Sequence, residues 1–325
     1  MSTCRFIPEP YQERRTYFAE NYDCAFMRDC RAKKPLIIEP EEQICRFCGR
    51  KAPDVKFRNK AHAIPELLGN KDIISRSECN TCNQHFGDML ENNLSLFLGP
   101  LLTVMGTRGK NKIPKYHHKG LEFKRDSPNY MEIIQTNGEE IPIDSAKKNI
   151  VISVAGHGFV PIGVYKSFVK MAISLMPFEI SKDFDCIKEW LLEQVHTNPI
   201  GAGAHCYYVF LPGNNLFPRV NPFVLIRKND MLDVPYCQFV VQFNNLMFQI
   251  FIPSFSRDSH LIGKEIPRPP LFPIIYEREQ AAWDAYKEKI GNPDFYIYDL
   301  SGTEKTSESL KIGYHFEQIE ENPIP

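Results

Sequence analysis

Four cysteines in two pairs constrain this chain more than any other feature of its sequence. Cys45 and Cys48 are separated by two residues, thirty residues follow, and Cys79 and Cys82 repeat the spacing. Two residues between thiolates allow one tight turn to direct both sulfurs at one ion, and two such turns complete a tetrahedral zinc site. The pattern predicts a structural zinc. Because sulfur fills all four positions, this zinc has no open position for catalysis.

The remaining composition favours a globular protein of the reducing cytoplasm. The N-terminus lacks the apolar stretch and the small-residue cleavage site of a secretory signal, so disulfides are not expected among the ten cysteines. No apolar run reaches the length of about 18 residues that a membrane span needs. The 325 residues, 43% of them hydrophobic, suffice for packed cores in roughly two domains.

The segment between and after the cysteine pairs predicts two strands followed by a helix. Apolar and basic residues alternate over residues 55–65, a strand pattern that ends at Pro65, and His62 lies at its far end on the polar face. Residues 72–77 return as a second strand after the turn at Gly69 and Asn70. Apolar residues then recur at helical spacing over residues 80–98.

These residues resemble a known family. Ala61-His62-Ala63-Ile64-Pro65 ends the first strand, and the helix region contains Glu78-Cys79 to Phe86-Gly87 and then Glu91-Asn92. A histidine before Ile-Pro, followed by a Cys-x-x-Cys-Asn helix start, is similar to the HNH (ββα-metal) endonucleases. The match is closest to the zinc-containing branch, including nuclease modules of bacterial antiphage defence systems. The resemblance covers about residues 44–105 and implies an α+β fold and metal-dependent hydrolysis of phosphodiester bonds.

The resemblance also implies roles for individual residues. His62 would be the general base that takes a proton from the attacking water, which suits an imidazole whose ordinary pKa is about 6.5. Asn83 would help to hold a catalytic divalent ion, Mg²⁺ or another, through its amide oxygen. Many family members carry an acidic metal ligand just before the histidine, and here that position is Ala61.

A carboxylate elsewhere must then replace the ligand that is missing at Ala61. The candidates are Glu66, Glu78, Asp88 and Glu91. Glu78, beside the zinc turn, and Glu91, two helical turns beyond Asn83, are the better placed. His85 projects about 200° away from Asn83, since each residue turns the helix by about 100°. We therefore expect His85 at the surface or in contact with DNA rather than at the ion.

Positive charge gathers in the first part of the chain. Residues 1–125 contain 22 Lys and Arg against 15 Asp and Glu, a net charge of +7, whereas the remainder carries −8. This asymmetry suits a polyanionic partner such as DNA, and two domains that merely differ in surface composition would also produce it. The candidate nucleic-acid contacts are Arg58, Lys60, Arg76, His85, Lys110 and Lys112.

The patterns divide the chain into three parts. They are an N-terminal helical flank (1–44) with a helix over 11–31, an HNH domain with structural zinc (45–120) and a mixed α+β domain (121–325). The basic stretch 108–119 forms the junction. The third part is predicted to contain strands near 130–135, 150–154, 204–211 and 223–227, two strands in 236–253, helices over 163–176, 184–195 and 277–290, and a weakly structured tail over 301–325.

Three functional interpretations are open. The first is a metal-dependent DNA endonuclease whose third part senses a signal, through a small-molecule or protein activator, or forms homo-oligomers. The second is a zinc-ribbon nucleic-acid-binding protein without catalysis, which Ala61 favours because it removes an expected ligand. The third keeps the hydrolysis but makes RNA the substrate, because the chemistry acts on any phosphodiester. None of the three requires a membrane.

Overall fold

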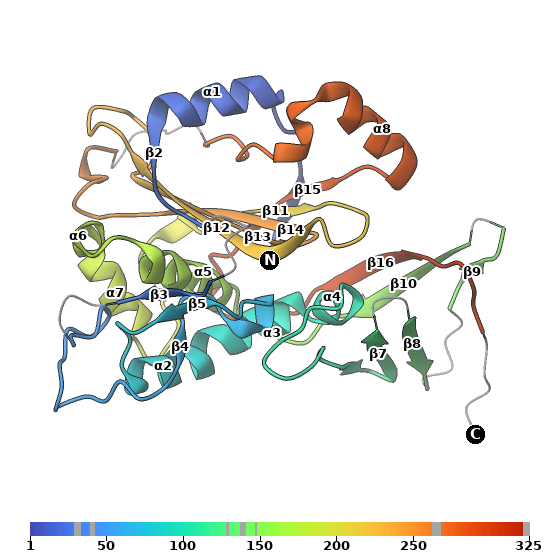
Figure 1. The fold of residues 1–325 in the computed structure, drawn as a ribbon, viewed down its shortest axis with the longest axis horizontal. Coiled ribbons are helices and arrows are strands. Elements are labelled where there is room, and N and C mark those ends of the chain that lie inside the picture. Colours follow the sequence, from blue (N-terminus) through green and yellow to red (C-terminus); the bar gives the residue numbers. More distant parts are fainter. Residues whose placement is uncertain are drawn as a thin grey trace.

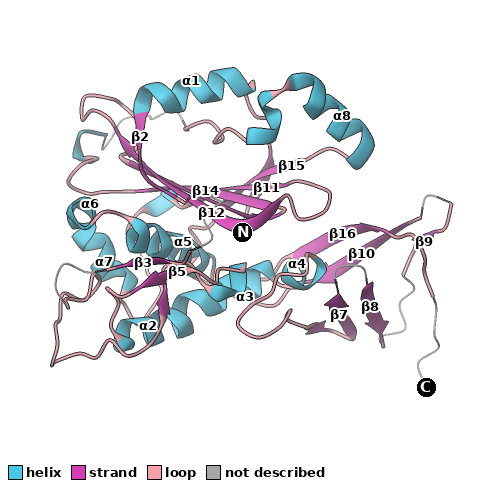
Figure 2. Ribbon diagram, in the orientation of Figure 1, coloured by secondary structure: helices cyan, strands magenta, loops and turns pink. Residues whose placement is uncertain are grey.

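The computed structural model describes residues 1–28, 34–39, 43–127, 130–136, 141–146, 148–261 and 268–320, and it has the expected mixed α+β fold (Figures 1 and 2). A seven-stranded sheet forms its centre, in the order β1-β15-β11-β14-β13-β12-β2. Neighbouring strands are antiparallel throughout. The strands are β1 (Thr3–Arg5), β2 (Tyr22–Met27), β11 (His205–Phe210), β12 (Phe217–Arg227), β13 (Cys237–Asn244), β14 (Leu246–Ile252) and β15 (Asp294–Asp299).

Helices cover both faces of this sheet. Helices α1 (Tyr11–Asn21) and α8 (Gln280–Ile290) lie over one face, and α5 (Pro161–Leu175) lies on the other (Figure 1). The ring of Phe168 in α5 packs against that of Phe248 in β14, with centroids 5.0 Å apart. Every residue of α5 is buried, because the cysteine-rich module encloses the helix from the side opposite the sheet. One continuous apolar core therefore runs from the sheet through α5 into the module.

The module contains the predicted order of strand, strand and helix. Strand β4 (Ala61–His62) pairs antiparallel with β5 (Ile73–Ser75), and β3 (Leu36–Ile38) pairs parallel with β5 on its other side. The long helix predicted over residues 80–98 is formed, with a π-helical turn at its centre. Its parts are α2 (Asn80–Phe86), the π turn (Gly87–Glu91) and α3 (Asn92–Leu98), and α4 (Pro100–Val104) follows.

The first predicted strand is shorter than residues 55–65. The alternation correctly predicts burial, because Val55 and Ala61 are buried while Lys60 is exposed. Strand pairing is nevertheless confined to Ala61 and His62. The preceding chain is held in another way, since the Asn80 side-chain oxygen accepts hydrogen bonds from the backbone N–H groups of residues 58 (2.9 Å) and 59 (3.0 Å). This contact fixes the approach to β4 against the start of α2.

The N-terminal helix ends at Asn21 rather than near residue 31. Strand β2 starts at the next residue and pairs with β12 at the edge of the large sheet. The last part of the predicted helix, residues 29–31, lies outside the described residues. Strand β1 likewise pairs with β15, so both N-terminal strands belong to the large sheet. Their partners lie some 200 to 300 residues away along the chain, so a local pattern could not reveal them.

The other strands form two small three-stranded sheets. One consists of β6 (Tyr116–His118), β7 (Leu121–Ser127) and β8 (Tyr130–Gln135), and the other of β16 (Ser309–His315), β10 (Asn149–Ala155) and β9 (Ile143–Asp144). The prediction of a weakly structured tail is wrong for β16, which pairs with β10 along its full length. The basic stretch 108–119 ends in β6 and is therefore not a loop throughout.

Most of the remaining elements agree with the sequence pattern, whereas β7 and β15 were not predicted. The strands and helices predicted for residues 121–300 are confirmed, except that the helix predicted over 184–195 is α7 (Asp185–Leu191), preceded by α6 (Phe178–Ser181). Within the part of the chain that is described, no helix has both the length and the apolar character needed to cross a lipid bilayer.

Candidate functional site

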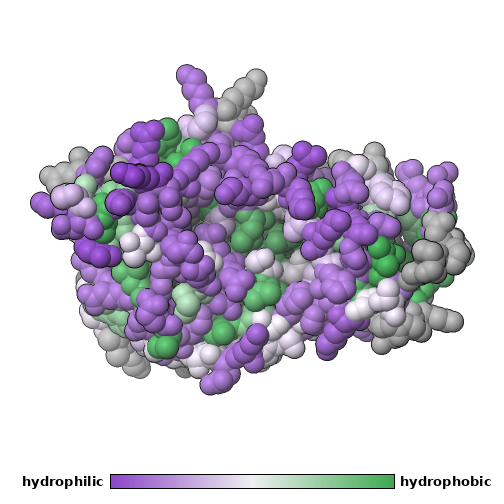
Figure 3. All heavy atoms as spheres, turned by 90° about the horizontal axis from the view of Figure 1, so that it is seen from below, coloured by the Kyte–Doolittle hydropathy of each residue, from purple (hydrophilic) through white to green (hydrophobic). Residues whose placement is uncertain are grey.

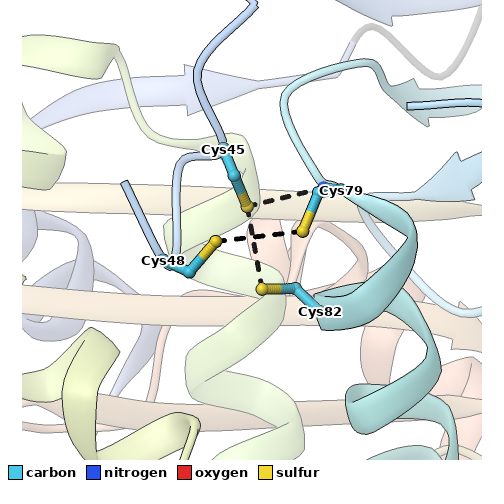
Figure 4. A group of neighbouring side chains, drawn as sticks. All are labelled: Cys45, Cys48, Cys79 and Cys82. Atoms are coloured by element: carbon cyan, nitrogen blue, oxygen red, sulfur yellow. Dashed lines mark hydrogen bonds between the residues drawn. The ribbon is translucent and has the colours of Figure 1, made fainter. Parts of the chain in front are cut away.

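The two cysteine pairs meet in one cluster (Figure 4). The four sulfurs all lie within 4.8 Å of one another. The Sγ–Sγ distance is 3.7 Å between Cys45 and Cys82 and 3.8 Å between Cys48 and Cys79. Sulfurs placed about 2.3 Å from a tetrahedral zinc are separated by about 3.8 Å, the edge of that tetrahedron. The cluster therefore has the spacing and the donor chemistry of a structural zinc site.

Local turns hold the cluster together. Gly49 follows the first pair with a φ of +68°, which glycine adopts without strain, and its N–H donates to the Cys45 carbonyl (2.9 Å). Cys79 precedes the first residue of α2, and its N–H donates to the Cys45 sulfur (3.4 Å). The hydrogen bond between Cys45 and Cys82, helped by backbone N–H groups, outweighs burial and lowers the pKa of Cys45 to about 4. A thiolate is the form that binds a metal.

Asn70 fixes the hairpin between β4 and β5, and the sequence predicted only a turn there. Its side-chain nitrogen donates to the carbonyls of Ile64 (2.6 Å) and Ile73 (3.1 Å). Its side-chain oxygen accepts from the N–H groups of Asp72 (3.2 Å) and Ile73 (2.9 Å). Asn70 is 1% exposed. A polar residue between two short strands, directly after a glycine, is the only sequence signal for this role.

Replacing Asn70 by alanine should destabilise the hairpin. The variant loses four hydrogen bonds and leaves buried backbone groups without partners, so we expect a loss of about 2–4 kcal/mol in the free energy of unfolding. Thermal or denaturant unfolding measures this, with the exposed Asn59 replaced by alanine as the matched control. Equal stability of the two variants would show that Asn70 does not support the hairpin.

His62 ends β4 and lies in a nearly closed environment. Its side chain is 11% exposed, and its Nε2 is buried without a hydrogen-bond partner among the described residues, 4.0 Å from Oε1 of Glu66. Burial is the largest influence on the pKa of His62 and lowers it. Glu66 opposes this effect, and the charges of Lys60, Lys170 and Lys71 add to it. The imidazole is therefore neutral at neutral pH, the state in which it can accept a proton.

Glu78, one of the predicted ion ligands, has a different partner. Its side chain is fully buried, and its Oε2 lies 3.1 Å from the ammonium of Lys170 in α5. Burial raises the pKa of Glu78, and Lys170 opposes that shift. The carboxylate is shielded from solvent and paired with an ammonium group, and its role as an ion ligand stays a prediction. The sequence pattern gave no sign of Lys170, because it lies more than 90 residues beyond Glu78 along the chain.

Asn83 and Glu91, the other predicted ligands, lie on the long helix. Glu91 lies eight positions after Asn83, which is about 12 Å along a helix axis, so they could share one ion only with both side chains extended toward each other. Burial raises the pKa of Glu91, and nearby Lys170 lowers it while Glu66 raises it. Among the described residues, only the four cysteines bring three or more His, Cys, Asp or Glu side chains close enough for a metal. A catalytic ion stays a prediction.

His85 faces another helix. Its Nε2 lies 3.0 Å from the carbonyl oxygen of Leu191 in α7, and its side chain is half-buried. One ring nitrogen is thus occupied by the protein itself. A contact of His85 with DNA stays a prediction.

The predicted nucleic-acid contacts are mostly available at the surface. Arg58, Lys60, Arg76, Lys110 and Lys112 are exposed, and Arg76 also forms a surface ion pair with Glu39 at 2.8 Å. Lys71, which was not predicted, joins the basic stretch to the hairpin: its ammonium contacts the carbonyl of Gly109 and lies 3.9 Å from Oε1 of Glu66. Seen from the side on which α2 lies, the surface is mostly hydrophilic, with hydrophobic residues in small separate patches (Figure 3).

Comparison with known proteins identifies the module. Residues 45–96, from the first cysteine into α3, match a family model described as HNH endonuclease. The match confirms the family resemblance for this module, and the rest of the chain lies outside it. No curated protein and no solved structure matches the chain. The match indicates a nuclease domain, whose substrate class is nucleic acid.

Proposed function

We propose that this protein is a metal-dependent endonuclease that hydrolyses DNA, with His62 as its general base. The observation that carries the proposal is the setting of His62. A histidine kept neutral by burial ends the hairpin of a module that matches the HNH endonucleases. Asn70 fixes that hairpin from inside, and Asn80 fixes its approach to the helix. The base is thus held on rigid elements rather than on a free loop.

Glu66 supports the role of His62 from one edge of the ring. Its carboxylate lies 4.0 Å from Nε2 and favours the tautomer with the proton on Nε2, which leaves the lone pair on Nδ1. Nδ1 then accepts the proton of the water whose oxygen attacks phosphorus. The phosphorus–oxygen bond to the leaving sugar oxygen breaks, and solvent protonates that oxygen. The imidazolium that forms faces Glu66, which stabilises its charge.

A divalent ion, Mg²⁺ or another, would when bound supply neutralisation of charge at the scissile phosphate. Asn83 is the ligand we propose first, because the zinc turn between Cys79 and Cys82 fixes the start of the helix that carries it. Glu91 is the acidic residue that remains once Glu78 is assigned to Lys170. The requirement is tested by removing divalent ions with a chelator, restoring Mg²⁺ alone, and measuring the bound zinc in the same sample.

Cleavage should persist when the pH is lower than the ordinary pKa of histidine. Burial and three neighbouring lysines lower the pKa of His62, so the base loses activity only when the pH falls below this lowered value. We expect the acid limb of kcat/KM against pH to have its midpoint below about 6.5. A pH profile recorded at constant ionic strength measures it. A midpoint above the ordinary value would mean that Glu66, not burial, dominates the environment of His62.

The substrate is decided by a direct comparison. Supercoiled plasmid and a single-stranded RNA are incubated with the full-length protein and with the His62→Ala variant, under the same Mg²⁺ and salt. Nicking of the plasmid that requires His62 supports the proposal. Cleavage of RNA alone would favour a ribonuclease. Binding without cleavage of either would favour the zinc-ribbon protein, the interpretation that Ala61 raises.

The rest of the chain is proposed to regulate this nuclease. A free DNase endangers its own cell, which motivates control by a small-molecule or protein activator, or by formation of homo-oligomers, in a role such as bacterial antiphage defence. The continuous core of module, α5 and sheet supports a mechanical link between the two parts. A full-length protein that degrades host DNA at full rate without any additive would contradict regulation.

A further inference from the structure

Helix α5 brings an ammonium group from outside the HNH module to the candidate base. Lys170 is 2% exposed. Its Nζ donates to the main-chain carbonyl of His62 (3.0 Å) and lies 3.1 Å from Oε2 of Glu78. The ammonium also lies over the ring of Phe86 in α2, 5.6 Å from its centroid. One group therefore contacts the strand of the base, the residue before the zinc turn and the long helix.

Such a group is costly to bury, so its partners matter. An ammonium taken out of water is tolerated in a protein interior only when a counter-charge and hydrogen-bond acceptors replace its hydration. Glu78 supplies the charge and the carbonyl of His62 supplies an acceptor. Neither acceptor can move far without leaving the ammonium unsatisfied. The arrangement thus restrains the position of His62 relative to α2.

The helix that carries Lys170 is itself fixed to the module. Arg46, which lies between the first two zinc cysteines, donates to the carbonyls of Ile173 (3.1 Å) and Met176 (2.6 Å) at the end of α5. Ser167 donates to the carbonyl of Leu90 in the π turn (2.8 Å). These contacts leave α5 little freedom to slide along the module. The position of Lys170 along β4 is therefore fixed.

We propose that Lys170 is a positioning residue for the nuclease reaction, which places His62 against the long helix through its main-chain carbonyl. The inference rests on the proposed role of His62 as base. It assigns part of the catalytic geometry to the segment of the chain outside the family match. A displacement of α5 would move His62. The segment outside the family match could thereby change the rate of cleavage.

The test uses a double variant, Lys170→Met together with Glu78→Gln, in the full-length protein. Lys170→Met alone would leave the buried Glu78 carboxylate uncompensated and risks unfolding, whereas removing both charges with residues of similar volume is tolerated by many interiors. Lys166→Met is the matched control, because Lys166 is a second buried lysine of α5. Its Nζ donates to the carbonyl of Trp190 (2.7 Å), and its counter-ion Glu193 is 40% exposed and can be solvated.

Zinc content, melting temperature, DNA affinity and the single-turnover cleavage rate are measured for each protein. The double variant should keep zinc and bind DNA within about two-fold of wild type, while its cleavage rate falls by about 10- to 100-fold, the effect of misplacing a reacting group by about 1 Å. Lys166→Met should cleave at the wild-type rate.

Two results would overturn the inference while leaving the proposed function intact. One is a double variant that cleaves at the wild-type rate. The other is a double variant that loses zinc, stability and activity together, which would assign Lys170 to folding. If the wild-type protein shows no cleavage that depends on His62, the proposed function fails, and the positioning role fails with it.

Discussion

Cys79→Ser is expected to lose the zinc and to unfold the HNH module. Among the described residues, four cysteines supply the whole ligand set. Binding of structural zinc supplies folding free energy on the order of 10 kcal/mol in finger-like peptides. Few domains have more stability than that to lose. Metal analysis and circular dichroism against temperature measure the effect.

The matched control is Cys186→Ser, which changes an exposed cysteine outside the cluster. It should retain one zinc ion per chain and have the melting temperature of the wild type. Because module and sheet share one core, the Cys79 variant should also destabilise α5 and the strands it packs on. A Cys79 variant that keeps its zinc and its melting temperature would show that the four cysteines do not form a structural zinc site.

His62→Ala is expected to reduce the rate of DNA cleavage by about 10²- to 10⁴-fold, the usual contribution of a general base. The effect should be confined to the chemical step. The side chain is 11% exposed, so it offers little surface to DNA, and the shortened residue leaves the Lys170 contact to the main chain in place. Single-turnover cleavage of a labelled duplex, with affinity measured separately, distinguishes rate from binding.

His85→Ala provides the contrast on the same module. The His85 ring contacts the carbonyl of Leu191. Loss of the His85 side chain should therefore change the cleavage rate far less than loss of the His62 side chain. Any effect on affinity should depend on salt, as for a contact to phosphate. If His85→Ala lowers the cleavage rate more than His62→Ala does, His85 and not His62 would be the general base.

Features that depend on neighbouring residues could be predicted from the sequence. The spacing of the cysteines predicted a cluster whose geometry suits zinc, because two residues between thiolates fix a local turn. The alternation before His62 correctly predicted which side chains are buried. The helical spacing after Asn80 predicted a helix to Leu98, although not its π turn. Each cysteine turn, the alternation and the helix depend mainly on contacts within a few residues.

Features that depend on distant partners could not be predicted. Residues 22–27 form a strand because β12 pairs with them, and residues 309–315 form one because β10 does. The ion pair of Glu78 with Lys170 could not be predicted either, because the lysine comes from α5, far along the chain. Asn70 is a different case: its partners are near in the sequence, but its four hydrogen bonds form only when both strands are in place.

The most direct measurement of the central claim is the rate at which full-length protein nicks a supercoiled plasmid. Wild type and His62→Ala are compared at equal zinc content, with Mg²⁺ added after chelation. We expect the wild type to nick the plasmid only when the ion is added, and His62→Ala to nick at or below about 1% of that rate with unchanged affinity for the plasmid. A wild type that binds the plasmid without nicking it, or a His62→Ala variant that nicks at the wild-type rate, would contradict the central claim.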